Sequence, residues 1–408
     1  MSEWKKVKLG EISQTIQTGP FGSQLHQSDY SVIGIPVVMP KDIIAGNIEE
    51  ASIARVEQHH IDRLSRHMIS YGDILYARRG DVGKCAFTKQ NQEGWLCGTG
   101  CLRVTINPDM ANPKFVFFQL QKQETIGWIT NHAIGSTMLN LNTTILSNAP
   151  VEIPSLRIQN RIVEILSRYD SLIENYQKQI KLLEEAAQRL YKEWFVDLHF
   201  PGHENTKIVD GVPEGWEKKK ISDICQTVGG GTPSTKVAEY YDDGNIKWVT
   251  PTDITRSNCL CLFDTDKKIT EDGLAHSSAK ILPPETILMT SRASVGYFGI
   301  YDCEVCTNQG FISCIPNERS YQMYMLYNLM NRVEEIRQKA GGSTYLEISK
   351  SVFRDFDIVL PSCMVLETFQ EQSHKMLDCM RQIAKQLRLL TEARDRLLPK
   401  LMSGEITV

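Results

Sequence analysis

The sequence predicts an α+β protein that is built twice, with two similar globular domains of short strands and mixed helices and two long helices between them. Three observations support this fold class: motifs that recur at a fixed offset, two apolar seams with helical spacing, and short apolar runs punctuated by Gly, Pro and Asn. Gly135-Ser136-Thr137 recurs as Gly342-Ser343-Thr344, at an offset of 342 − 135 = 207. A repeat this long indicates a duplicated domain, not a solenoid of units of about 20–50 residues.

The beginning and the end of each copy are duplicated as well. Residues 4–12 (WKKVKLGEI) match residues 216–224 (WEKKKISDI), and Ile153-Pro154 matches Leu360-Pro361. We therefore expect a first globular domain over 1–154, a first long helix over 155–197, a linker and second domain over 198–361, and a second helix and tail over 362–408.

Composition bounds the class of protein. The chain has 408 residues, a net charge of −4 and 41% hydrophobic residues, and no run approaches the ~18 apolar residues of a membrane span. The start, Met1 to Lys6, lacks the apolar core of a signal peptide. We expect a cytoplasmic protein whose eleven cysteines are reduced, buried small hydrophobes. Any nucleic-acid surface must be local, because the chain as a whole is not basic.

The first long helix is predicted by a seam of apolar residues whose spacing alternates between three and four, as in a coiled coil. Moved by 207 residues, the seam recurs with two weaker positions, Ser373 and Arg394. The first seam consists of Ile162, Leu166, Tyr169, Ile173, Tyr176, Ile180, Leu183, Ala187, Leu190 and Trp194. The second consists of Phe369, Ser373, Met376, Met380, Ile383, Leu387, Leu390, Arg394, Leu397 and Leu401.

Chain order predicts that these helices are antiparallel. A short Pro/Gly-rich link, Pro201 to Gly215, ties the second globular segment to the end of the first helix, and that segment runs directly into the second helix after Pro361. The predicted arrangement is two globular domains at opposite ends of a stiff pair of helices. Apolar residues off the seam, including Leu172, Phe195 and Leu389, are expected to face outward.

Each half contains a hairpin that delivers an arginine onto a glycine-containing turn. In the first half the strand 73–77 leads into Arg78-Arg79-Gly80 and on to Lys84; in the second, 286–290 leads into Ser291-Arg292 and Gly296. Such a cation can reach a phosphate or a guanine edge. The alternative is an ordinary surface arginine paired with a nearby carboxylate.

Two more segments are paired. Met39-Pro40-Lys41-Asp42 corresponds to Thr250-Pro251-Thr252-Asp253, and we expect both aspartates to form turns instead of acting as catalytic acids. The Gly-Ser-Thr segments offer backbone N–H groups and hydroxyls to a phosphate oxygen, although a plain turn is the simpler reading. The candidate DNA-binding residues are Lys41, Arg78, Arg79, Lys84, Ser136, Thr137, Thr252, Ser291, Arg292, Ser343 and Thr344.

Catalytic motifs are missing from the sequence. It has no DPPY- or NPPF-like tetrapeptide, and no glycine-rich loop placed to seat S-adenosylmethionine or a dinucleotide. Cys303 and Cys306 form a CxxC without a second pair, and positions i and i+3 of an extended segment face opposite sides, which argues against zinc. We expect no catalytic and no metal-binding residues.

In this order and twice over, these motifs resemble the specificity (S) subunits of type I restriction–modification systems, and the resemblance covers essentially the whole chain. It implies a non-catalytic reader of double-stranded DNA, in which two target-recognition domains bind the halves of a bipartite, asymmetric site and the helices set the unread gap. It also implies docking of two methyltransferase (modification) subunits, joined by restriction (translocase–nuclease) subunits. S-adenosylmethionine, ATP and Mg²⁺ then belong to these partners, and this chain needs no cofactor.

Two alternatives remain at the level of sequence. A stand-alone methyltransferase or nuclease would bind S-adenosylmethionine or a metal itself. A coiled-coil adaptor unrelated to DNA would agree with the acidic net charge, and it would show no salt-dependent binding to duplex DNA.

Overall fold

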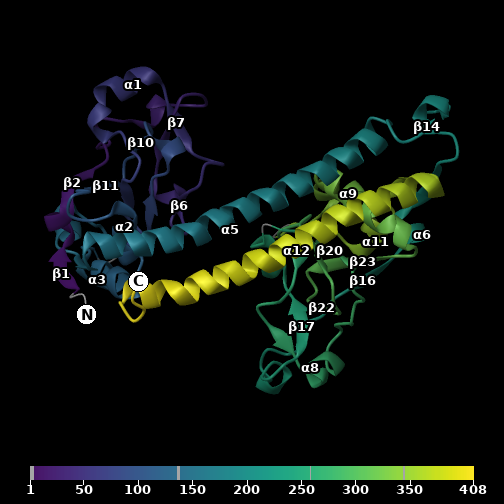
Figure 1. The fold of residues 1–408 in the computed structure, drawn as a ribbon. Coiled ribbons are helices and arrows are strands. Elements are labelled where there is room, and N and C mark those ends of the chain that lie inside the picture. The colour runs from purple at the N-terminus through teal and green to yellow at the C-terminus, as the bar shows by residue number, and fades with distance from the viewer. Residues whose placement is uncertain (1–3, 136–137, 258, 343–344) are drawn as a thin grey trace. The chain divides into compact units, whose positions relative to one another are not determined.

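The chain folds into two compact units. The computed structural model describes residues 4–135, 138–257, 259–342 and 345–408. One unit comprises Met1–Ser171 with Thr391–Val408, and the other Leu172–Leu390. Both divisions fall inside the long helices, α5 (Leu156–Tyr191) and α12 (Cys363–Met402) (Figure 1).

The first unit is built around an antiparallel sheet of order β2-β11-β8-β9. Its strands are β2 (Ser13–Thr18), β11 (Cys101–Ile106), β8 (Ile74–Ala77) and β9 (Cys85–Phe87). A second sheet has the order β10-β4-β7-β3, with strands β10 (Leu96–Cys97), β4 (Ile35–Val38), β7 (Ala54–Val56) and β3 (Tyr30–Ser31). The first unit also has two separate two-stranded sheets: β1 (Lys5–Lys8) with β12 (Pro150–Ile153), and β5 (Ile43–Ile44) with β6 (Asn47–Ile48).

Helices close the core of the first unit. They are α1 (Gln58–Arg63), α2 (Pro113–Leu120), α3 (Gln123–His132) and α4 (Thr143–Ser147). The Asn112 side chain caps α2 and the Asn142 side chain caps α4, because each accepts hydrogen bonds from the first-turn N–H groups. Phe115 of α2, Leu102 of β11 and Leu401 of α12 belong to one buried apolar cluster. The ends of the long helices are therefore part of this core.

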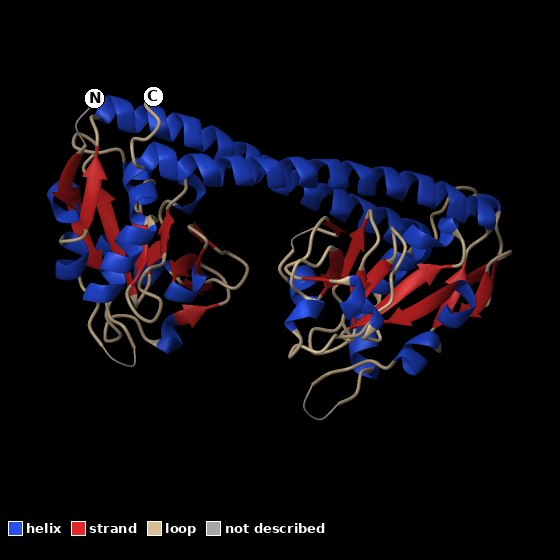
Figure 2. Cartoon of the chain, turned by 90° about the horizontal axis from the view of Figure 1, so that it is seen from below, coloured by secondary structure: helices blue, strands red, loops and turns tan. Residues whose placement is uncertain are grey.

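The second unit repeats this plan, but its main sheet has one strand more and its smaller sheet one strand fewer than in the first unit. Its main sheet has the order β16-β23-β20-β21-β18, and a smaller sheet has the order β19-β17-β22. Figure 2 shows the strands of both units in red and the helices in blue. The strands are β16 (Cys225–Gly229), β23 (Phe311–Pro316), β20 (Ile287–Thr290), β21 (Phe298–Tyr301), β18 (Cys261–Leu262), β19 (Lys268–Ile269), β17 (Ile246–Val249) and β22 (Cys306–Thr307). The shorter pairs are β13 (Ile208–Val209) with β14 (Val212–Pro213) and β15 (Glu217–Lys220) with β24 (Asp357–Leu360). The helices are α6 (Ile221–Ile224), α7 (Pro251–Thr255), α8 (Glu271–Ala275), α9 (Gln322–Asn331), α10 (Val333–Lys339) and α11 (Lys350–Arg354).

Strand register confirms the duplication residue by residue. Lys5 pairs with Ile153 in the first unit, and Glu217 pairs with Leu360 in the second. These two pairs are related by the same offsets that the sequence shows at the two ends of the repeat, 217 − 5 = 212 and 360 − 153 = 207. The two-domain α+β fold predicted from the repeat is therefore correct.

The two predicted seams form the packed faces of α5 and α12. Every seam position is buried or half-buried, including both weak ones. The buried Ser373 hydroxyl donates to the Phe369 carbonyl, 2.5 Å away, so it needs no external partner. Arg394 lies 3.5 Å from the Asp170 carboxylate of α5, which explains how an arginine fits in the seam.

Contacts within each unit show that the helices are antiparallel. In the second unit Ile180 of α5 packs with Ile383 of α12, while the ring centre of Trp194, just after α5, lies 5.8 Å from that of Phe369, earlier on α12. In the first unit the early α5 residue Ile162 shares a cluster with Leu401, near the end of α12. The two helices therefore run in opposite directions, as predicted.

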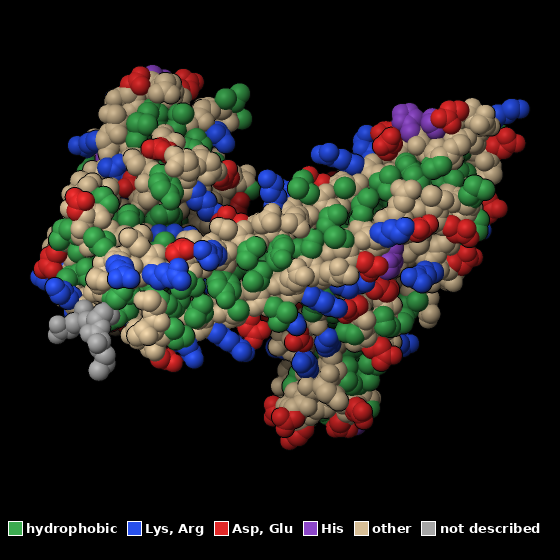
Figure 3. Space-filling view, in the orientation of Figure 1, with side chains coloured by type: hydrophobic (Ala, Val, Ile, Leu, Met, Phe, Trp, Pro, Cys, Tyr) green, Lys and Arg blue, Asp and Glu red, His purple; other side chains and the backbone are tan. Residues whose placement is uncertain are grey.

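Outside the seam, one expectation was wrong. Phe195 does not face outward: after α5 the chain makes a π-helical turn (Lys192–Val196), and the Phe195 ring packs 4.8 Å from both Tyr324 and Phe369. The wider π turn carries the ring into the core of the second unit. Leu172 and Leu389 are 44% and 59% exposed, as expected. Hydrophobic side chains line the visible face of the long helices (Figure 3).

The cysteines are only partly as expected. All eleven are free, and burial raises the pKa of the Cys85, Cys97 and Cys306 thiols to about 12. Cys363 and Cys379, however, are exposed on α12. In the described part of the chain no group of three potential ligands is placed to hold a metal ion. No helix in that part is both long and apolar enough to cross a membrane.

Candidate nucleic-acid interface

In the first unit, the arginine turn after β8 is held between two other segments. The Arg78 N–H donates to the Gly100 carbonyl at 2.7 Å, and the Arg78 carbonyl accepts from the Leu141 N–H at 2.8 Å. The Gly80 N–H donates to the Leu139 carbonyl at 3.1 Å. The backbone of the turn is therefore fixed on both sides, and the Arg79 side chain between these bonds is exposed.

The second unit repeats these hydrogen bonds one for one. The Ser291 N–H donates to the Gly310 carbonyl at 2.8 Å, and the Ile348 N–H donates to the Ser291 carbonyl at 3.0 Å. The Ala293 N–H donates to the Leu346 carbonyl at 2.8 Å. Arg292 thus occupies the place of Arg79, and Ser291 the place of Arg78.

The Pro-containing turns meet the same glycines. An added Cβ at Gly100 would lie 3.3 Å from Pro40, and one at Gly310 would lie 2.9 Å from Pro251. Close packing of each proline on a glycine therefore joins the Pro turn to the arginine turn. The loops 98–100 and 308–310 at this junction were not singled out from the sequence, although a glycine just before a strand at matched places in both halves was a usable signal.

The aspartates of these turns act as turn-formers, as expected. An Asp42 carboxylate oxygen accepts from the Met39 N–H at 2.8 Å, and an Asp253 oxygen accepts from the Thr250 N–H at 2.7 Å. Burial raises the pKa of Asp42, with the Met39 N–H and Lys41 acting in the opposite direction.

The residues that flank the two Gly-Ser-Thr segments lie beside the arginine turns. Ser136, Thr137, Ser343 and Thr344 lie outside the described residues, but the segments that flank them are described. Ile134 and Asn140 exchange two backbone hydrogen bonds of 3.0 and 2.8 Å. Gly341 and Glu347 exchange an equivalent pair, also of 3.0 and 2.8 Å. A β-bridge then sets Asn140 against Arg79, and another sets Glu347 against Arg292.

The structure thus brings the arginine turn, the Pro turn and the flanks of the Gly-Ser-Thr segment together in each unit. The residue at the bridge, Asn140 or Glu347, is a further candidate that sequence reasoning missed. Its position depends on a pairing between distant segments, which a local motif cannot reveal. Asn140 is half-buried, and its side-chain oxygen has no hydrogen-bond partner among the described residues.

The predicted cations of the first unit differ in their surroundings. Arg79 and Lys41 are exposed, and the Lys41 ammonium lies 3.4 Å from the Ser52 carbonyl. The Arg78 guanidinium is half-buried and lies 5.9 Å from the centre of the Phe21 ring. Lys84 lies 3.2 Å from the Asp81 carboxylate, with half of its side chain exposed.

The second unit carries fewer cations at the matching places. Thr252 replaces Lys41, Ser291 replaces Arg78 and Tyr297 replaces Lys84. Its matching arginine, Arg292, lies 3.5 Å from the Glu347 carboxylate. The two units therefore present different charges on matching backbone.

A comparison with protein families finds the same duplication of the chain. The model of the "Type I restriction modification DNA specificity domain" matches the chain twice, over residues 1–185 and 213–396. The chain belongs to this family. It is a DNA specificity subunit of a type I restriction–modification system, which is the non-catalytic subunit of such an enzyme.

Curated relatives and a solved structure are similar to this specificity subunit. The HindI specificity subunit of Haemophilus influenzae is 24% identical over 472 aligned positions, covering 100% of both chains. The MjaIX specificity subunit of Methanocaldococcus jannaschii is 38% identical over 153 residues, covering 37% of this chain and 35% of that one. The crystal structure of the S subunit from M. genitalium has a TM-score of 0.63 at 16% identity, covers 98% of this chain and 96% of its own, and supports the fold.

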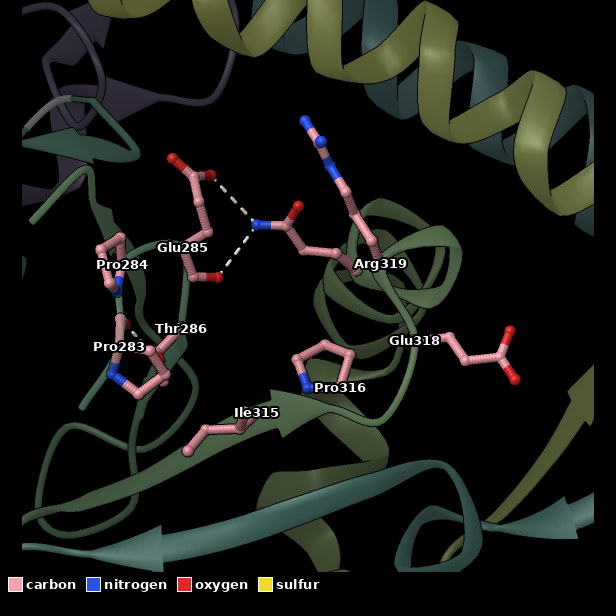
Figure 4. Close-up of a pocket in the computed structure, with 9 residues that line it drawn as sticks. Pro283, Pro284, Glu285, Thr286, Ile315, Pro316, Glu318 and Arg319 are labelled. Carbon is pink, nitrogen blue, oxygen red and sulfur yellow. Dashed lines mark hydrogen bonds between the residues drawn. The ribbon is translucent and has the colours of Figure 1, made fainter.

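A hollow in the second unit of the specificity subunit lies away from these motifs. Its volume is about 310 Å³, and it is lined by residues just before β20 and at the end of β23 (Figure 4). Because these strands are antiparallel, the Arg292 turn and Gly310 lie at their other ends. Gln322 donates to the Glu285 carbonyl and carboxylate at 2.9 and 3.1 Å, and Glu285 lies 2.6 Å from Arg381 of α12. We interpret this hollow as part of the contact through which the domain attaches to α12.

Proposed function

We propose that each globular domain of this specificity subunit reads one half of a bipartite, asymmetric site in double-stranded DNA. The observation that carries the proposal is the twofold convergence of an arginine turn, a Pro turn and the flanks of a Gly-Ser-Thr segment. Exposed cations on rigid backbone suit phosphate contacts, which fix register, while neighbouring polar side chains can reach base edges. The proposed DNA-binding residues are those predicted from the sequence, with Asn140 and Glu347 added.

The two halves of the site should differ in sequence. Asparagine commonly pairs with adenine in the major groove, whereas a glutamate carboxylate repels a nearby phosphate. Asn140 and Glu347 take equivalent places beside Arg79 and Arg292. Different side chains on equivalent backbone support two different half-sites.

We further propose that the long helices set the unread gap and dock two methyltransferase subunits, with restriction subunits joining that complex in the cytoplasm. Leu172 and Leu182 are exposed on α5, and Met364 and Leu389 are exposed on α12, which supports contact between the long helices and a partner. S-adenosylmethionine, ATP and Mg²⁺ would be bound by those partners. The proposed domain boundaries are 1–154, 155–197, 198–361 and 362–408.

A domain exchange tests the reading of half-sites. Residues 217–360 would be replaced by the matching domain of another member of the family, and methylated sites would be mapped in cells that supply the methyltransferase. One half of the methylated sequence should change, while the other half and the gap stay as they were. A change in both halves, or in neither, would contradict one domain per half-site.

A further inference from the structure

We propose that Met138 and Tyr345 are DNA wedges, apolar side chains that insert between neighbouring bases in each half-site. This inference deepens the proposed function and rests on it. The two residues occupy the same place in the two copies, because 345 − 138 = 207 is the offset of the Gly-Ser-Thr segments. Each is 64% exposed.

Single exposed apolar residues are ordinary on protein surfaces. A matched pair within the proposed DNA interface is different, because each lies one residue from a segment that is hydrogen-bonded to an arginine turn. The Leu139 carbonyl accepts from Gly80, and the Leu346 carbonyl accepts from Ala293. The backbone next to each exposed side chain is thereby held at the turn that carries Arg79 or Arg292.

A glycine before each wedge residue also fixes the backbone that carries its side chain. Gly135 and Gly342 have φ values of +125° and +129°, which only glycine adopts readily. In both, an added Cβ would overlap the carbonyl oxygen of the proposed wedge, Met138 or Tyr345. The residues on the two sides of each wedge, 134 with 140 and 341 with 347, are joined by paired backbone hydrogen bonds.

The side chains suit this task. Methionine and similar apolar side chains open base steps when they are inserted, and an aromatic ring such as that of tyrosine stacks on bases. Moving an exposed apolar side chain from water into a base step has little free-energy cost. The neighbouring arginine would hold the adjoining phosphate. The wedge would thus act on DNA shape, whereas Arg79, Asn140, Arg292 and Glu347 would act through charge and hydrogen bonds.

The test uses the complex with methyltransferase subunits and a duplex that carries its methylated sequence. 2-Aminopurine is placed at each position of a half-site in turn, and its fluorescence should rise at one step in the wild-type complex. In Tyr345→Ala that rise should vanish for the second half-site, and in Met138→Ala for the first. Met110→Ala is the matched control, since Met110 is 47% exposed in the turn before α2 and should change nothing.

Binding separates insertion from a simple groove contact. Affinity of Tyr345→Ala for the intact duplex should fall about 5- to 150-fold, the usual range for one lost base stack. A duplex with an abasic position at the identified step is already unstacked, so it should bind wild type and variant alike. Tyr345→Phe and Tyr345→Trp should behave as wild type.

Three results would overturn the wedge: no step with raised fluorescence, unchanged affinity of both alanine variants, or an equal loss on intact and abasic duplexes. Thermal unfolding of each variant checks that the fold is kept. If the wedge fails while the domain exchange still changes one half-site, the proposed function stands and only this inference falls.

Discussion

The Arg292 Nε lies 3.5 Å from a Glu347 carboxylate oxygen, whereas Arg79, in the equivalent place, faces Asn140. Asn140 and Glu347 sit on equivalent β-bridges, one in each unit, so the difference comes from one side chain and not from the backbone. Both members of the Arg292–Glu347 pair are 49% exposed, and the pair itself therefore adds little stability. Its consequence is electrostatic: an acid stands where the second domain is proposed to meet DNA.

Replacing Glu347 with glutamine should tighten binding to a duplex carrying the methylated sequence. Removing one negative charge near a phosphate should raise affinity about fivefold at low salt, since two unit charges 4 Å apart interact by about 1 kcal/mol in water. The gain should shrink as salt screens the charge. Glu239→Gln, the same change at an exposed position in the second unit, is the control. Weaker binding with a relaxed choice of base would instead mark Glu347 as a base reader.

Arg79→Ala should weaken binding through the first half-site, and Arg292→Ala through the second. If the arginine reads a base, the binding free energy should weaken by about 1–3 kcal/mol. If it holds a phosphate, the slope of log affinity against log salt should be smaller by about one. Titration at several salt concentrations, with duplexes mutated in one half-site at a time, separates these effects. Unchanged affinity and slope in both variants would make the two arginines ordinary surface residues.

The isolated chain should be stabilised by methyltransferase subunits, two per chain. The exposed Leu172 and Leu389 would be covered in that complex. Sedimentation of the co-expressed proteins measures the stoichiometry. A Leu172→Ser/Leu389→Ser variant should lose the complex, and Val32→Ser, at a 93% exposed position in the first unit, should keep it. A well-behaved monomer that ignores the methyltransferase would contradict the docking proposal.

Four residues inserted into α5 between 176 and 187 should lengthen the unread gap without altering either half-site. One added helical turn is about 6 Å, or one to two base steps of about 3.4 Å. The insertion also shifts the seam, where Ile180 packs on Ile383, so a matched insertion between 383 and 394 keeps the helices paired. Methylome sequencing reads the spacer. Altered half-sites with an unchanged gap would mean that the domains, not the helices, set the spacing.

Much of this fold could be predicted because the duplication and the seams are local, periodic signals. Ten positions of three-four spacing in each copy define a buried face, and even Arg394 followed the pattern by pairing with Asp170. Phe195 could not be placed, because its direction depends on a π-helical turn that side-chain periodicity does not encode.

The candidate site was predicted in pieces. Arg79 and Arg292 were recognisable from the duplicated hairpins, and Asp42 and Asp253 from turn chemistry. Their convergence was not predictable, because it depends on hydrogen bonds between segments that are about 60 residues apart, such as Gly80 with Leu139. Asn140 and Glu347 were missed for the same reason, since the two residues differ and no repeat marks them.

The most direct test is to map methylated adenines across the host genome with this gene present and with it deleted. One bipartite sequence, with two different halves and an unread gap of fixed length, should be methylated only when the gene is present. A methylome that is unchanged by the deletion, or a lost motif that is continuous or has two identical halves, would contradict the reading of separate half-sites by the two domains.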